Sequence, residues 1–491
     1  MLSNIAIGFS ASMTLTNILF SLVGVIVGVI IGAIPGLGPA MGIAVTVPLT
    51  YGMQPETGML LLMGIYCGAV YGGSITAILL GVPGTPASIT TVWDGYKMTQ
   101  LGRPAKALNT AIVASTIGGL LSALALLFLS PYLAKVTLLF GPPEYVALAI
   151  WGLGIICSLE AKSLVKGLIS GCLGLMLATV GMSPITGSSR FTFGQISLSS
   201  GIETIPVLIG LFCIPEVIAL VEAEQIKEIS VKGGLHLKEF FKEFRETSVW
   251  TSIRAGIIGV IIGIIPGAGG TIAPFITYND AKNHSKTPEK FGTGHMPAIA
   301  SSEAANNGAS CSSLVPLLTL GVPGSSAAVV FLGALTIHGL QPGSLLFEKQ
   351  PDIIYGLLVG SVIIQLYMLV VGLFGAPWIA KTTKMANGIL IPAIVVFSCI
   401  GAYANNNNLF NVWVMLVFGF IGFFMRKLNL SPAAMVLAMI LGPIFEKNLI
   451  RSLAISYGSW TIFFTRPICI LFYILTIVMI AGPMRKALKA K

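Results

Sequence analysis

The sequence predicts an all-α polytopic membrane protein of about 10–12 transmembrane helices, arranged as two inverted repeats. Apolar residues make up 55% of the 491 residues and charged residues only 9%, against roughly 25% charged residues in an average soluble protein. Apolar stretches of about 20 residues, the length that crosses a bilayer, recur along almost the whole chain. A pair of motifs found in the same order in both halves predicts the repeat.

The duplication is visible in two Pro-Gly motifs. GVIIGAIPG at 28–36 matches GVIIGIIPG at 259–267 in eight of nine positions, and LGVPGTPA at 80–87 matches LGVPGSSA at 320–327 in six of eight. We therefore expect a first repeat, a cytoplasmic connector and a second repeat at 1–221, 222–250 and 251–491. Within them we expect a broken helix at 16–51, a hairpin at 56–93, four further helices over 107–221, a second broken helix at 251–279, a second hairpin at 297–340 and further helices over 352–483.

Each repeat opens with the predicted broken helix. Pro266 follows Arg254 by twelve residues, about 18 Å of helix, which places the break near the middle of a hydrocarbon core of about 30 Å. Proline removes an N–H and glycine lets the backbone unwind, and such freed polar groups are tolerated in a membrane only where they line a cavity or lie inside protein. The break residues are thus candidates for binding substrate or ion: Gly36, Gly38, Gly267, Gly269 and Thr271.

The predicted hairpins contain the second motif, which adds further break residues that could bind substrate or ion. A helix that restarts after the break presents free N–H groups and about half a positive charge at its N-terminus. Four such helix starts would attract a di- or tricarboxylate without any lysine inside the membrane. The carbonyl groups at the neighbouring ends of the interrupted helices would suit Na⁺. The alternative is that each Pro-Gly pair is only a turn at a helix end. The candidates here are Gly84, Thr85, Gly324, Ser325 and Ser326.

Polar side chains in these segments add further candidates. Glu303, Asn306 and Asn307 are spaced to share one helical face, and a carboxylate in an uncharged segment is an ion ligand or proton carrier unless it lies at the membrane surface. Tyr71 and Ser74 take the comparable place in the first repeat. They are either hydroxyl ligands or part of the close helix packing around Gly72 and Gly73. We place a possible Na⁺ near Gly36, Gly267 and Asn306.

Other classes of protein fit poorly. The formal charge is +10, but the cations are scattered over short connectors, as in membrane proteins, so no nucleic-acid partner is expected. The four histidines are isolated, and neither H-E-x-x-H nor a serine with a base occurs, which argues against an enzyme and against any cofactor. A passive channel is left open by the sequence.

Loop charges predict the orientation. Lys and Arg accumulate in cytoplasmic loops, so the basic loop at 94–106, the connector and the basic C-terminus lie inside. Five crossings counted back from the C-terminus leave the loop at 339–352 outside, and the N-terminus falls on the periplasmic side. The two equivalent loops then lie on opposite faces, which is the inverted arrangement.

The chain resembles the large membrane subunit of the tripartite tricarboxylate transporters, the TctA family. The resemblance rests on GAIPGLGPAMGIA, YGGSITAILLGVPGTPASITTVWDGY, PGAGGTIAPF, SEAANNGASCSSLVPLLTLGVPGS, GAYANNNNLFNVWVM, ILGPIFEKNLIRSL and FFTRPI, which extend over nearly the whole chain. It implies a permease of the bacterial inner membrane that works with a small membrane subunit (TctB-like) and a periplasmic solute-binding protein (TctC-like). The implied activity is uptake of citrate-like carboxylates, coupled to Na⁺ or H⁺, with no cofactor.

Overall fold

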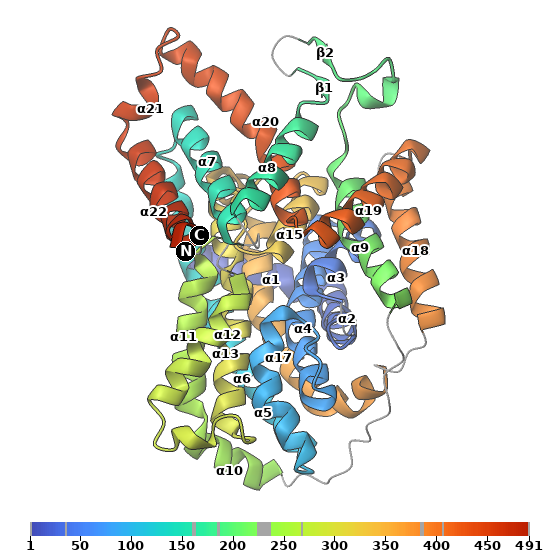
Figure 1. Ribbon diagram of the computed structural model, residues 1–491, viewed down its shortest axis with the longest axis vertical. Helices are drawn as coiled ribbons and strands as arrows, with labels where there is room; N and C mark the ends of the chain where they lie inside the picture. The colour runs from blue at the N-terminus through green and yellow to red at the C-terminus, as the bar shows by residue number, and fades with distance from the viewer. Residues whose placement is uncertain are drawn as a thin grey trace.

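The computed structural model describes residues 2–34, 37–159, 164–183, 187–222, 237–266, 269–382, 387–404 and 407–489. Figure 1 shows a helical molecule whose described strands are one short antiparallel pair, β1 (Gly181–Met182) and β2 (Ser189–Arg190). Seven helices of the described part are long and apolar enough to cross a membrane, or eight if the bent pair at 240–264 forms one span. The predicted class, an all-α polytopic membrane protein, is confirmed.

The helices of the first half are α1 (Leu2–Ser12), α2 (Leu15–Gly32), α3 (Pro39–Thr46), α4 (Pro55–Leu80), α5 (Ile89–Gln100), α6 (Pro104–Thr137), α7 (Pro142–Leu159), α8 (Leu164–Ala178) and α9 (Thr204–Glu222), with 3-10 turns η1 (Val47–Thr50), η2 (Pro86–Ser88) and η3 (Ile196–Leu198). The second half contains α10 (Leu237–Thr247), α11 (Val249–Ile264), α12 (Gly269–Asn283), η4 (Pro288–Lys290), α13 (Met296–Ser312), α14 (Leu314–Leu320), α15 (Ser326–Ile337), α16 (Ser344–Lys349), α17 (Pro351–Thr382), α18 (Asn387–Ala404), α19 (Leu409–Leu428), α20 (Pro432–Ile455), α21 (Ile462–Thr465) and α22 (Pro467–Lys489).

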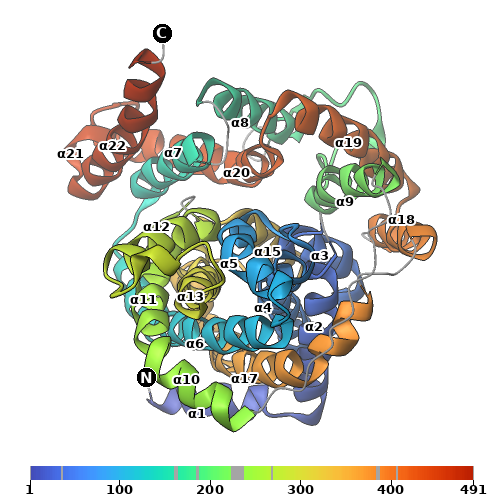
Figure 2. The ribbon, with the colours of Figure 1, turned by 60° about the horizontal axis from the view of Figure 1, so that its bottom comes forward.

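The helices fall into a core and an outer row. In Figure 2 the motif-bearing helices α2–α5, α11–α13 and α15 surround the centre together with α6 and α17, while α7–α9 and α18–α22 lie along one side. The outer row mixes the two halves, since α20 packs on α7 and α8, and α9 packs on α18 and α19. The core mixes them too, because α6 packs on α11 and α13 while α17 packs on α2 and α4.

Small residues bring α2 and α4 into backbone contact. A Cβ atom added to Gly28 would lie 2.8 Å from Cα of Ile65, and one added to Gly32 would lie 2.8 Å from Cα of Ala69. Glycine at these positions permits the close approach that drives helix association in lipid. The contacts advance by four residues on both helices together, so α2 and α4 run parallel.

The same packing recurs between α11 and α13. A Cβ on Gly259 would lie 2.8 Å from Cα of Ala305, and one on Gly263 would lie 2.7 Å from Cα of Ala309. The contacts again advance in step. Gly28 is the motif counterpart of Gly259, so the packing makes position 65 the counterpart of position 305, the same offset that relates the two LGVPG motifs.

The chain reverses direction at the break between α11 and α12. The Arg254 guanidinium, near the start of α11, lies 2.7 Å from the carboxylate of Asp280, near the end of α12. Thr277 of α12 donates a hydrogen bond to the carbonyl of Ser301 near the start of α13. The segment predicted as a broken helix at 251–279 is therefore a hairpin that returns to the end from which it started, because the proline and glycines interrupt the helix and the ion pair joins its two ends.

The segment predicted as a hairpin at 56–93 instead passes through the core. α4 is followed by Gly81 in a left-handed conformation, φ 70°, which turns the chain back until the Gly84 N–H donates to the carbonyl of Gly73 at 3.2 Å. α5 then runs outward again, and Thr99 near its end donates to the carbonyl of Ile78. The chain therefore leaves the core at the end where α4 finishes, which is opposite to the end where α4 begins. Only the loop between α4 and α5 is re-entrant.

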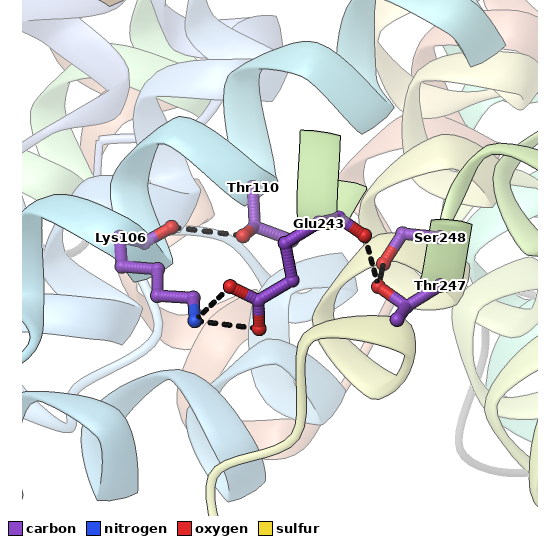
Figure 3. A network of polar contacts seen from close by, with 5 residues as sticks. All are labelled: Lys106, Thr110, Glu243, Thr247 and Ser248. Carbon is purple, nitrogen blue, oxygen red and sulfur yellow. Dashed lines mark hydrogen bonds and ion pairs between the residues drawn. The ribbon is translucent and has the colours of Figure 1, made fainter. Parts of the chain in front are cut away.

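The connector ends in an amphipathic helix held against the core. Phe240 and Phe244 of α10 are buried, and the Nζ of Lys106, in the first turns of α6, lies 2.6 Å from the carboxylate of Glu243 (Figure 3). Thr247 continues the network by donating to the Glu243 carbonyl. These contacts place the end of the connector beside the start of α6.

Candidate functional site

The two halves meet where α4 packs antiparallel to α13. The Tyr66 hydroxyl lies 2.9 Å from that of Ser313, and the sulfurs of Cys67 and Cys311 are 3.7 Å apart. Gln365 of α17 donates its side-chain N–H to both sulfurs, at 3.2 and 3.4 Å. Since residue numbers rise on one helix as they fall on the other, α4 and α13 run in opposite directions through the centre of the core.

One polar cluster at this interface lies at the start of α15. The Ser325 hydroxyl accepts the Ala328 N–H and caps the helix. The Tyr66 hydroxyl, from the other half, lies 3.3 Å from that of Ser325. α3, which begins after Gly38, packs against α15. The cluster therefore joins Tyr66 of the first half to the re-entrant loop of the second half.

A second cluster lies at the start of α12 and is built around Asn306. The Asn306 side chain is buried, and its Nδ2 has no hydrogen-bond partner among the described residues. A Cβ on Gly270 would lie 3.6 Å from Asn306 Oδ1, so this amide lies against the first turn of α12. η2 packs against both α12 and α13, and the Thr85 hydroxyl in front of η2 lies 3.0 Å from that of Ser88.

The elements that follow the four breaks thus pack as two mixed pairs, α3 with α15 and η2 with α12. Tyr66 belongs to the first pair and Asn306 to the second. In the register set by the glycine packing, these two residues are counterparts in the two repeats. Tyr71 and Ser74, proposed from sequence as counterparts of the Glu303 segment, correspond in that register to Cys311 and Leu314, which lie one to three helical turns beyond Glu303, Asn306 and Asn307.

The glycines of the second motif are enclosed by backbone. A Cβ on Gly84 would lie 2.5 Å from the carbonyl oxygen of Gly32 and 2.7 Å from Cα of Gly73. In the other half the Gly324 N–H donates to the carbonyl of Ser313 at 3.2 Å, as Gly84 does to Gly73. The two re-entrant loops therefore dock on their own halves through the same contact.

Glu303 lies at the centre of a third cluster, which joins the two halves. Its side chain is fully buried, and one carboxylate oxygen accepts the Thr91 hydroxyl of α5 at 2.5 Å while the other accepts the Ser115 hydroxyl of α6 at 3.2 Å. Asn307 donates its Nδ2 to Ser115 at 2.9 Å. Asn307 Oδ1 and the Tyr71 hydroxyl are buried without a hydrogen-bond partner in the described part of the chain.

The remaining residues predicted from the sequence lie in different places. Gly36 and Gly267 lie outside the described residues. Thr271 is exposed in the first turn of α12, which begins at Gly269. Ser74 is buried and donates to the carbonyl of Tyr71. Gly38 precedes α3 with open space where a side chain would be, and Ser326 is the first residue of α15.

Sequence reasoning missed Tyr66, Thr91 and Ser115. The offset of 240 residues between the LGVPG motifs assigns Tyr66 to the position of Asn306, which was a usable signal. Thr91 and Ser115 carried no such signal, because isolated hydroxyl residues are common in membrane helices. Only the packing of α5 and α6 against α13 brings them to Glu303.

Asp94 was also missed, since the sequence assigned it to a loop. It is fully buried on α5, where its carboxylate accepts the backbone N–H groups of Gly292, Gly294 and His295 at 2.8–3.0 Å and the Tyr278 hydroxyl at 2.9 Å. These bonds fix the loop that leads into α13. Asp94 therefore supports the site from its end without belonging to it.

The two halves meet over interrupted helices, re-entrant loops and buried polar side chains. This combination defines the class of multi-pass membrane transporters. Within that class the chain belongs to the tripartite tricarboxylate transporter TctA family, whose family model matches residues 18–437. It is the permease component of a system with further subunits, and not an enzyme.

Two relatives from Agrobacterium vitis are similar to the chain. An uncharacterized 52.8 kDa protein in the TAR-I ttuC′ 3′ region is 37% identical over 471 residues, which cover 95% of this chain and 93% of the relative. A protein in the TAR-II ttuC′ 3′ region is 37% identical over 213 residues, which cover 43% of this chain and 87% of the relative. No solved structure matches the chain. The resemblance seen in the sequence is thereby confirmed at the level of the family.

Proposed function

We propose that this permease takes up di- and tricarboxylates, citrate-like compounds among them, in symport with Na⁺ across the bacterial inner membrane. A periplasmic solute-binding protein (TctC-like) delivers the substrate, and a small membrane subunit (TctB-like) completes the complex. The two halves act as inverted repeats that give alternating access to a site between them. The C-terminus lies in the cytoplasm and the N-terminus in the periplasm.

The observation that carries the proposal is the cluster around Asn306. Its unpaired buried Nδ2 is a hydrogen-bond donor, and an unsatisfied buried donor is costly unless a ligand completes it. The start of α12 adds free N–H groups and a partial positive charge beside it, and the neighbouring η2 brings the hydroxyl of Ser88 and that of Thr85, which precedes η2. Neutral donors gathered at a helix start suit a carboxylate.

The antiparallel packing of α4 and α13 supports the inverted repeat. Both helices carry the same glycine contacts to their own first helix, yet they cross in opposite directions. The charge distribution supports the orientation, because Lys106, Glu243 and Arg254 gather at one end of the core with the basic segment at 282–290. An accumulation of cations marks the cytoplasmic end.

Uptake of labelled citrate into proteoliposomes that contain the permease and the small subunit, with the binding protein outside, tests the proposal. We expect accumulation above the external concentration that depends on an inward Na⁺ gradient. Uptake driven equally well by a pH gradient without Na⁺ would favour proton coupling of an organic anion. Equilibration without accumulation would indicate a passive anion channel.

Asn306→Asp tests the site itself, because it preserves shape and places a negative charge against the substrate carboxylate. We expect uptake to fall by at least tenfold. Asn279→Asp is the matched control, since Asn279 lies exposed on α12 and, within the described part of the chain, donates its side-chain N–H to the Phe275 carbonyl of its own helix. Equal uptake by the two variants would contradict the assignment of Asn306.

A further inference from the structure

We infer that Glu303, Asn307, Thr91 and Ser115 form the binding site of the coupling Na⁺, one helical turn away from the carboxylate site at Asn306. The inference rests on the proposed function and adds the place where the cation binds. The sequence placed a possible Na⁺ near Gly36, Gly267 and Asn306 and offered Glu303 as an ion ligand or proton carrier; the inference places the cation at Glu303 with the three residues around it.

The first argument is charge. Glu303 is fully buried on α13, and no Lys, Arg or His of the described residues forms an ion pair with it. A buried charge without a partner costs several kcal/mol, so it is either neutralised or paired. Two neutral hydroxyls, from Thr91 and Ser115, do not supply a positive charge. A bound cation does.

The second argument is the set of ligand atoms. Hard cations take oxygen ligands, and oxygens surround this carboxylate: the Thr91 and Ser115 hydroxyls bond to it directly, and Asn307 is tied to it through Ser115. Asn307 Oδ1 and the Tyr71 hydroxyl are both buried without a hydrogen-bond partner among the described residues. A metal cation can bind the Asn307 oxygen and the Glu303 carboxylate together, whereas a proton on Glu303 satisfies the Asn307 oxygen only if the acid O–H is directed at it.

The third argument is position. Thr91 lies in the first turn of α5, directly after η2 and the re-entrant loop of the first half, Ser115 lies on α6 of the same half, and Glu303 and Asn307 belong to the second half. A cation held by all four fixes η2 and α13 relative to each other, and these are the elements that flank Asn306. Glu303 precedes Asn306 by three residues, a spacing that puts Cβ atoms about 5–6 Å apart.

These placements predict reciprocal binding. Without a cation, the Glu303 carboxylate repels a substrate carboxylate at Asn306, and the cation converts that repulsion into attraction. By linkage, the substrate must raise the affinity for Na⁺ by the same factor. Symport of a cation and a carboxylate follows from one electrostatic coupling across one turn of α13.

The test is Na⁺ binding to the purified permease, measured by thermal stabilisation and by ²²Na⁺ binding against choline, in a readout that needs no transport. We expect saturable binding to the native protein and none to Glu303→Gln. Ser115→Ala should weaken Na⁺ affinity by roughly tenfold through loss of one oxygen ligand. Ser122→Ala is the matched control on the same helix, because its buried hydroxyl accepts the Ser312 N–H instead, and it should bind Na⁺ as the native protein does.

Na⁺ binding by Glu303→Gln at native affinity would overturn the inference, and so would equal losses in Ser115→Ala and Ser122→Ala. Stabilisation by lowered pH alone, with no response to Na⁺, would also overturn it in favour of a protonated carboxyl. Should Glu303→Gln fail to fold, the two serine variants decide the matter. Native Na⁺ binding at this site without carboxylate uptake would refute the proposed function while leaving the cation site standing.

Discussion

Replacing Gly84 with alanine probes whether the re-entrant loop must dock as closely as it does. The added Cβ would lie 2.5 Å from the Gly32 carbonyl oxygen and 2.7 Å from Cα of Gly73. Both are backbone atoms, and no rotamer change can move them aside. Either the loop retreats from α2 and α4, or its hydrogen bond from Gly84 to Gly73 lengthens.

The size of the effect follows from overpacking. Forcing one carbon into a filled site costs about 1–3 kcal/mol. A cost of about 2 kcal/mol against the docked loop lowers its population relative to displaced loops by roughly 30-fold. Because the docked loop carries Thr85 toward the start of α12, we expect uptake to fall, by at most about the same factor, while the helices still fold into the membrane.

The assay is Na⁺-driven citrate uptake per molecule of reconstituted permease, with thermal unfolding in detergent as the check on folding. Gly152→Ala is the control, since a Cβ there would meet side-chain carbons of Leu441 and Val322 at 3.3–3.4 Å, which can adjust. That variant should transport normally. Native uptake and native stability in Gly84→Ala would refute the docking argument, and loss of uptake in both variants would show that it is not specific.

Three further outcomes follow from the contacts at the interface and at its end. Asp94→Ala leaves three backbone N–H groups unpaired and should destabilise the permease by at least about 2 kcal/mol. Asp280→Ala breaks a partly exposed ion pair and should cost about 1 kcal/mol or less. Thermal unfolding compares the two variants, and equal shifts of the unfolding midpoint would contradict the role of Asp94. Oxidative cross-linking of Cys67 to Cys311 by a small membrane-permeant oxidant should stop uptake by joining α4 to α13, with recovery on reduction and no inhibition of the Cys67→Ala variant. Tyr66→Phe should lower stability by about 1 kcal/mol through loss of its bonds to two serine hydroxyls, and an unchanged unfolding midpoint would show that these bonds contribute nothing.

Much of the fold was accessible from the sequence because its causes are local. Apolar stretches of membrane-crossing length predict the class, since unpaired backbone groups exclude other structures from lipid. Pro-Gly motifs predict where helices stop, and the φ of 74° at Gly321, like that of Gly81, shows why glycine is needed there. The duplication followed from matching strings.

The direction of the chain after each break was not accessible in the same way. The motif at 259–267 specifies that the helix ends, but the return of α12 alongside α11 depends on the ion pair between Arg254 and Asp280 and on packing against α13. Equal lengths of apolar sequence are compatible with a crossing or with a hairpin, because hydropathy does not record direction.

The sequence alone determined the membrane class, the family, the positions of the interruptions and the choice of Glu303, Asn306 and Asn307 as polar residues to examine. Tertiary structure decided their partners: Asn306 faces the start of α12, while Glu303 and Asn307 meet Thr91 and Ser115 from the other half. The reason is physical. A break is specified by the backbone preferences of a few adjacent residues, whereas a binding site between two repeats is assembled from side chains about 200 residues apart, which only the packing of α5 and α6 on α13 brings together.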